Sequence, residues 1–120
     1  KKKGQLLLQV DDAKKGDFIV PAVVRRGKLS ISISTDGASP SLTRKLKKDI
    51  DEQFDERFGE YVDFLDEARK VILQEIQDTN VKRKCLKSLL DSKFYELTMQ
   101  EKFAERDIYL NQLIEEGEQT

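Results

Sequence analysis

The hydrophobic pattern of this chain changes its period once, and that change constrains the fold more than any other feature. Residues 29–34 alternate strictly, with three aliphatic side chains on one face and three serines on the other, which is typical of a half-buried β-strand. After Pro40, large apolar residues recur at every fourth position, as Leu42, Leu46, Ile50 and Phe54. This spacing indicates an amphipathic helix. The chain is therefore predicted to be α+β, with its strands first.

Three β segments are predicted before the change of period. Residues 6–10 form a short, mostly apolar run that stops at Asp11, as a buried strand does when its polar end reaches the sheet edge. Residues 18–25 are β-rich but contain Pro21, which cannot donate to a ladder and favours an edge strand or a bulge. Residues 18–25 and 28–34 are predicted to pair as an antiparallel hairpin.

A bundle of about four helices is predicted to follow the short strand and the hairpin. Ser39 is a good N-cap, and Pro40 fits the first helical position, where its missing N–H costs nothing. Gly59 is expected to separate the first helix from the second, and the run Asp78-Thr79-Asn80 to cap the third. A fourth helix is expected at about residues 98–115, and residues 115–120 are expected to fray.

The charge of the chain is divided between its two halves. Residues 1–48 hold 12 Lys and Arg against 4 Asp, a formal charge of +8. Residues 49–120 hold 10 against 19 Asp and Glu, a formal charge of −9. Such asymmetry indicates a partner for the basic half. The two halves could instead attract each other, within one chain or across a dimer, and the sequence leaves both interpretations open.

Several classes of site are excluded by the residue types that the chain lacks. It has one cysteine, Cys85, and no histidine, so it offers no internal disulfide, no cysteine-rich metal site and no Cys–His nucleophile. Cys85 is predicted to be a small buried hydrophobe, and no metal site is expected. The chain contains no apolar run of 18 residues, so neither a membrane span nor a membrane partner is expected, and cysteine usage fits a cytoplasmic location.

The stretch STDGASPSLTRKL, residues 34–46, is the strongest candidate for a binding site. A loop that ends at a helix N terminus offers unpaired N–H groups and a partial positive charge, which suit an anion. The candidate ligands are Ser34, Thr35, Gly37 and Ser39, with Arg44 one turn into the helix and Arg26 at the hairpin turn. The alternative is purely structural, with Ser39 as a cap and the serines on a solvated strand face. Phosphate-loop spacing is absent, and Asp36 disfavours phosphate.

These motifs resemble the central segment of the siroheme synthase family. Its members are NAD-dependent precorrin-2 dehydrogenases, some of which also act as sirohydrochlorin ferrochelatases. The resemblance covers about residues 10–50. The matching residues, in order, are Asp11, Phe18-Ile19-Val20-Pro21-Ala22, Arg26, Ser34-Thr35, Gly37, Ser39-Pro40 and Leu42-Thr43-Arg44.

The resemblance implies a domain organisation and a role for each matched residue. Residues 1–17 would end a truncated dinucleotide-binding domain, 18–77 would form the dimerisation domain of a homodimer, and 78–120 a C-terminal helical domain. Asp11 would be the catalytic base, and the substrate precorrin-2, a tetrapyrrole polyanion, would be bound by Ser34, Thr35, Gly37, Ser39, Arg26 and Arg44.

The sequence departs from the family pattern in its glycines. The parent enzyme uses NAD, but no G-x-G occurs in this chain, so the dinucleotide-binding loop is missing. The chain alone is therefore expected to be inactive. Whether the parent is also a ferrochelatase stays open, as does the effect of Thr35, which stands where some relatives have a second serine.

Two interpretations from other functional classes compete with the enzyme. The lysines and arginines of the basic half could form a nucleic-acid-binding module, although aromatic residues do not interleave with those cations, so base stacking would be poor. Nucleic acid is therefore not expected to be a partner. The chain could also be a purely structural dimerisation domain, which is partly compatible with a role in the enzyme.

Overall fold

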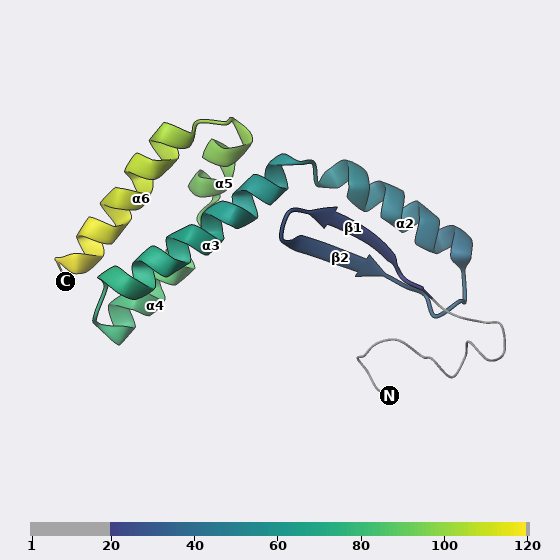
Figure 1. Ribbon diagram of the computed structural model, residues 1–120, viewed down its shortest axis with the longest axis horizontal. Helices are drawn as coiled ribbons and strands as arrows, with labels where there is room; N and C mark the ends of the chain where they lie inside the picture. Colours follow the sequence, from purple (N-terminus) through teal and green to yellow (C-terminus); the bar gives the residue numbers. More distant parts are fainter. Residues whose placement is uncertain (1–19, 120) are drawn as a thin grey trace. The chain divides into compact units, whose positions relative to one another are not determined.

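The computed structural model describes residues 20–119, which form a β-hairpin followed by five helices (Figure 1). The predicted α+β class is confirmed, with one more helix than expected. The predicted strand at residues 6–10 lies outside the described residues, as does the start of the predicted hairpin. The elements, in chain order, are β1 (Ala22–Arg26), β2 (Leu29–Ile33), α2 (Pro40–Gln53), α3 (Arg57–Glu75), α4 (Thr79–Ser88), α5 (Ser92–Met99) and α6 (Phe103–Glu118).

The described residues divide into two compact units. The hairpin–α2 unit comprises residues 20–25 and 30–54. The helical unit comprises residues 55–119 together with residues 26–29, the turn of the hairpin. The turn is therefore packed as part of the helical unit, although its strands belong to the other. None of the described helices has the length and apolar character needed to cross a membrane.

The hairpin closes through a two-residue turn at Gly27 and Lys28. Gly27 has a φ of 59°, and a positive φ at the first central position is the pattern of a type II′ turn, which suits the twist of paired strands. The predicted alternation in β2 is confirmed, because its two serines are exposed whereas Ile33 is buried. On β1, Val24 is only 2% exposed.

Helix α2 begins where the sequence predicts. Ser39 adopts an extended conformation and its side chain accepts a hydrogen bond from the Leu42 N–H, while Pro40 occupies the first turn. The apolar stripe of α2 is present but not covered. No residue of this helix is buried, and Leu42 and Leu46 are 45% and 36% exposed.

The expected helix break at Gly59 is wrong. Helix α2 ends at Gln53, Phe54 is extended, and α3 starts at Arg57, so Gly59 lies buried inside α3. The break has another cause, because the Asp55 carboxylate accepts a hydrogen bond from the Arg57 N–H at 2.9 Å. A short acidic side chain that binds a nearby backbone N–H competes with helix continuation.

The helical unit packs α3 against α4, α5 and α6, and α6 also contacts α4 and α5. Asp78 is the N-cap of α4, as predicted, and accepts hydrogen bonds from two backbone N–H groups. Cys85 is 4% exposed, which confirms its prediction as a buried hydrophobe. The buried core consists of Tyr61, Phe64, Ala68, Ile72, Ile76, Cys85, Leu89, Phe94 and Ile114.

The predicted fourth helix at residues 98–115 is wrong in its boundaries, because two helices occupy this region. Thr98 lies near the end of α5, and α6 begins at Phe103. Between them Glu101 has a φ of 58°, a left-handed conformation that ends a helix even in a non-glycine residue. No glycine or proline marks this turn, so the sequence carried no strong signal for it.

The expected fraying from residue 115 is also wrong, since α6 continues to Glu118. A Cβ built on Gly117 would lie 2.8 Å from Ile76 Cδ1 and 3.0 Å from Cys85 Sγ. Gly117 therefore lets α6 approach the core more closely than any other residue could, and this packing holds the end of the helix.

One charged side chain lies inside the helical unit. Arg106 is 6% exposed, and its guanidinium lies 4.2 Å from the ring centre of Phe64 and 4.8 Å from that of Phe103. It donates hydrogen bonds to Thr98 Oγ1 at 3.0 Å and to Glu60 Oε2 at 3.1 Å. Two aromatic faces and two acceptors compensate for much of the cost of burying this charge.

Candidate functional site

The candidate anion-binding loop is a tight turn that connects β2 to α2. The Ala38 N–H donates to the Thr35 carbonyl at 3.0 Å. The two residues between them, Asp36 and Gly37, have φ values of 57° and 79°. Two successive positive φ values are the pattern of a type I′ turn, which favours Gly and Asp. The predicted role of Gly37 in backbone geometry therefore has a conformational basis.

The hydroxyls of this loop bind the loop itself. Thr35 Oγ1 accepts the Ser39 N–H at 3.1 Å and lies 3.1 Å from Thr43 Oγ1. Ser39 Oγ caps the helix by accepting the Leu42 N–H at 3.2 Å. Ser34 Oγ accepts the Asp36 N–H at 3.1 Å. Ser39 is thus a helix cap, as the structural alternative predicted, and the hydroxyls stabilise the loop. Any ligand would bind a loop whose shape is already fixed.

Thr43 is a member of this network that the site prediction missed. Its hydroxyl lies beside that of Thr35 and also donates to the Ser39 carbonyl at 3.2 Å. The signal was the spacing of two threonines around a capping serine, since Thr43 stands four residues after Ser39, one helical turn along.

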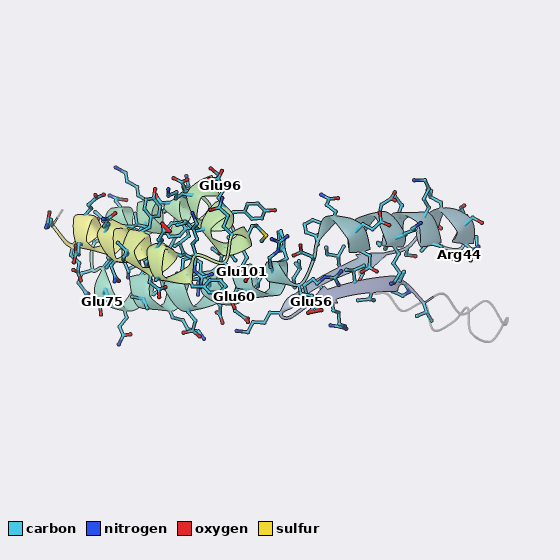
Figure 2. All side chains as sticks on the ribbon, turned by 90° about the horizontal axis from the view of Figure 1, so that it is seen from above. Arg44, Glu56, Glu60, Glu75, Glu96 and Glu101 are labelled. Atoms are coloured by element: carbon cyan, nitrogen blue, oxygen red, sulfur yellow. The ribbon has the colours of Figure 1, made fainter. Side chains whose placement is uncertain are left out.

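Two cations, Arg44 and Lys45, lie exposed on α2, one turn after the loop. Arg44 is exposed on the second turn of the helix (Figure 2) and donates a hydrogen bond to Ser41 Oγ at 3.3 Å. Lys45 pairs with Asp49 at 3.0 Å, four residues further on. Such exposed pairs are worth little and exchange readily for a stronger anionic partner. Arg44 therefore combines an accessible guanidinium with a position near the positive end of the helix dipole.

Arg26 lies at the other end of the hairpin from the loop. It is the last residue of β1, whereas Ser34 follows the last residue of β2. The five residues of an extended β2 span roughly 16 Å. The predicted substrate-binding residues thus form one close group, Ser34, Thr35, Gly37 and Ser39, with Arg44 on the adjoining helix and Arg26 apart from them. Asp11, the predicted base, lies outside the described residues.

The residues described here do not fit NAD. Their sheet is a two-stranded hairpin, so no parallel strand leads into a helix whose N terminus could hold a pyrophosphate. Residues 20–119 also contain no group of three His, Cys, Asp or Glu side chains arranged to hold a metal ion.

Two family models match the chain in tandem. Residues 26–53 match the central domain of sirohaem biosynthesis proteins, and residues 58–103 match the SirC C-terminal domain. The first match contains the candidate loop and α2, and the second starts within α3. The chain therefore matches two successive domains of siroheme-biosynthesis proteins, the family that the sequence motifs resemble.

Individual relatives carry names from the same family. The precorrin-2 dehydrogenase of Priestia megaterium is 36% identical over 93 residues, which cover 78% of this chain and 46% of that protein. The siroheme synthase of Gluconobacter oxydans is 30% identical over 82 residues, covering 68% of this chain and 17% of that protein. The solved structure of SirC, a precorrin-2 dehydrogenase, is 35% identical with a TM-score of 0.66, covering 78% of this chain and 45% of that one. The chain thus spans less than half the length of these relatives.

Proposed function

We propose that this chain is the substrate-binding and dimerisation part of an enzyme that oxidises precorrin-2 to sirohydrochlorin. The observation that carries the proposal is the pre-formed loop at the N terminus of α2, within the segment that matches the central siroheme domain. A macrocycle rimmed with carboxylates needs fixed positive ends rather than a deep apolar pocket. A helix N terminus and an accessible arginine supply them.

Each part of the loop would have a separate function in substrate binding. Arg44 and the first turn of α2 bind carboxylates, while the bonds among Thr35, Ser39 and Thr43 keep the turn in one conformation before substrate arrives. Pre-organisation of this kind lowers the entropic cost of binding. Asp11 accepts the proton released on oxidation. In this family NAD takes the hydride, and the residues described here do not supply its site.

A second copy of the chain completes the proposed assembly. Leu42 and Leu46 lie on the same stripe of α2, and both are more than a third exposed. An aliphatic stripe on a helix with no buried residue favours association. The hairpin and the first two helices are the proposed contact. The predicted domain boundary at residue 77 stays a prediction.

A titration with uroporphyrin, a stable octacarboxylate tetrapyrrole, tests the substrate proposal directly. We expect saturable binding that weakens with salt, and we expect Arg44→Gln to raise the Kd about tenfold, the worth of one charge-assisted hydrogen bond. Arg69→Gln removes an exposed arginine from α3 and is the matched control, which should leave the Kd unchanged. Equal losses in both variants would show that only net charge matters and would contradict the proposal.

The proposed base is tested in the complete enzyme. Asp11→Ala should slow precorrin-2 oxidation by about 10²–10⁴-fold, the usual worth of a positioned general base, while Asp12→Ala should change the rate only slightly. Single-turnover kinetics measure both. Near-normal turnover in the Asp11 variant would exclude it as the base.

A further inference from the structure

The turn of the hairpin packs closely against the backbone of Gly59. A Cβ built on Gly59 would lie 3.1 Å from the Arg26 carbonyl carbon, 3.2 Å from the Gly27 nitrogen and 3.3 Å from the Arg26 oxygen. These neighbours are backbone atoms of a short turn, which cannot rotate away as a side chain can. Gly59 lies in the first turn of α3, where glycine costs helix stability, so its presence indicates a packing requirement.

An ion pair holds the same turn on the same face of α3. Lys28 Nζ lies 2.6 Å from Asp66 Oδ2 and 3.6 Å from Asp63 Oδ1. Gly59, Asp63 and Asp66 are spaced i, i+4 and i+7, so they form one stripe along the helix. Asp66 also lies 3.4 Å from Lys70. The turn therefore rests on a glycine at one end of this stripe and is held by carboxylates further along it.

The positive charge of Arg26 interacts with the carboxylate of Asp55, just before the start of α3. The pKa of Asp55 lies below its usual value, chiefly because Arg57 donates hydrogen bonds to it and to a smaller extent because of the positive charge of Arg26. Arg26 and Asp55 belong to the same unit. The backbone of Arg26 is in contact with Gly59, and its side chain is within electrostatic reach of Asp55.

We infer that Gly59 is a positioning residue for Arg26, and that the stripe of Gly59, Asp63 and Asp66 on α3 fixes the direction in which Arg26 meets a carboxylate of the substrate. The inference rests on the proposed function and on the family resemblance, which implies that Arg26 is one of the substrate-binding residues. A methyl group at position 59 must move the Arg26 backbone by a few tenths of an ångström. Small displacements of a ligand-binding group cost affinity out of proportion to their size.

The test is a double-mutant cycle on uroporphyrin binding. Gly59→Ala should raise the Kd about fivefold, and Arg26→Ala about tenfold. Because Gly59 acts through Arg26, adding Gly59→Ala to Arg26→Ala should change the Kd no further. Independent effects that multiply in the double variant would overturn the inference.

Gly117→Ala is the matched control for a purely structural effect. Gly117 also lies in a helix with close neighbours, but these are the Ile76 and Cys85 side chains of the core. We expect the Gly117 variant to unfold at a lower urea concentration with an unchanged Kd. If both glycine variants lost affinity in proportion to their stability, the role of Gly59 would be structural only and the inference would be overturned.

The titration of Asp66 tests the position of the hairpin turn without any substrate. Hydrogen bonding from Lys28 lowers the pKa of Asp66, so displacement of the turn should raise that pKa towards its ordinary value. We expect Gly59→Ala to produce this rise in a carboxyl-carbon NMR titration, and Gly117→Ala not to. An unchanged Asp66 titration in the Gly59 variant would overturn the inference.

The two proposals fail in different ways. If Arg44→Gln weakens uroporphyrin binding but Arg26→Ala does not, the proposed function stands and the inference is overturned. If the wild-type chain shows no saturable binding, the proposed function fails for this chain. The Asp66 titration then still decides whether Gly59 positions the turn.

Discussion

The two compact units of this protein differ in how completely they bury their apolar side chains. The helical unit closes four helices around a core that includes Phe94 and Ile72, which are 1% and 0% exposed. The hairpin–α2 unit buries Val24 and Ile33 but leaves every residue of α2 at least partly accessible. Since burial of apolar area is the main source of stability, the first unit is stabilised from within. The second depends more on turns, caps and, in our proposal, a second copy of the chain.

The same contrast applies to polar groups. In the helical unit a buried guanidinium is enclosed by two rings and two acceptors. In the hairpin–α2 unit the hydroxyls of Thr35, Ser39 and Thr43 form a network at the edge of the unit. The buried guanidinium cross-links the core of the helical unit, whereas the hydroxyl network fixes the conformation of a surface loop. The proposed site therefore lies in the unit that buries fewer of its own residues.

The largest difference between the units should appear when large side chains are truncated. We expect Phe94→Ala to lower the free energy of unfolding by about 3–5 kcal/mol, because it leaves a cavity in the core. Leu46→Ala, at a residue 36% exposed, should cost less than about 1 kcal/mol when measured at concentrations where the chain is monomeric. Urea denaturation measures both, and equal losses would contradict the contrast.

Thr98 tests the buried polar group of the helical unit. Thr98→Val keeps the shape but removes the hydroxyl that Arg106 binds, so we expect a loss of about 2 kcal/mol in unfolding free energy. Thr43→Val removes a half-buried hydroxyl from the other unit and should cost about 1 kcal/mol or less. Calorimetric melting measures both. A larger loss at Thr43 would reverse our ranking of the two networks.

Removal of a helix N-cap should lower the free energy of unfolding by a similar amount in the two units. The structural effect should be local to the helix that loses its cap. Ser39→Ala and Asp78→Ala should each cost about 1 kcal/mol. Hydrogen exchange should show faster exchange in the first turn of α2 for the first variant and of α4 for the second. Faster exchange throughout the chain in both variants would mean that the two units unfold as one.

The ion pair between Lys28 and Asp66 should give the smallest effect, with a defined pH range. The pKa of Asp66 is lowered from 3.8, mainly by the hydrogen bond from Lys28, so its contribution is present above that value and is lost as the pH falls through the lower, folded-state pKa. The pKa of Lys28 is raised from 10.5 by Asp66, so its contribution is lost only as the pH rises through the still higher folded-state pKa.

Asp66→Asn measures the contribution of the Asp66 charge, which pairs with both Lys28 and Lys70. The stability difference from wild type should be constant between about pH 5 and 9 and should vanish near pH 2. Because both groups are exposed, we expect the difference to be small and to decrease with salt. Asp63→Asn, at the longer distance, is the control. A difference that persists at pH 2 would show that Asp66 acts through packing rather than charge.

Local pattern predicted much of this fold because local physics decides those parts. The alternation in β2, the Ser39 and Asp78 caps and the burial of Cys85 follow from short-range chemistry, and all are confirmed. Gly59 was misjudged because glycine often ends a helix, and residues 115–120 because chain ends often fray. Both Gly59 and Gly117 instead permit close approach by distant segments. The turn at Glu101 and the burial of Arg106 also depend on tertiary contacts that no short window contains.

The candidate site was predictable to a similar degree. The loop residues were identified as hydroxyl-rich and poised at a helix N terminus, and the structure brings them together. What the sequence could not give was the direction of each hydroxyl, because the same residue types serve as caps or as ligands. Thr43 was overlooked for that reason. The ion pair of Lys28 with Asp66 joins residues 38 positions apart, beyond any local pattern.

Sedimentation equilibrium tests whether a second copy of the chain covers the exposed apolar stripe of the hairpin–α2 unit. At tens of micromolar, where an interface of about 800 Å² per partner should hold, we predict a dimer. The double variant Leu42→Glu/Leu46→Glu should be monomeric. The matched variant Leu90→Glu/Ile108→Glu, at residues of the helical unit that lie outside α2 and α3 and are 69% and 58% exposed, should remain a dimer. A wild-type monomer, or a dimer that survives charges on α2, would contradict the account.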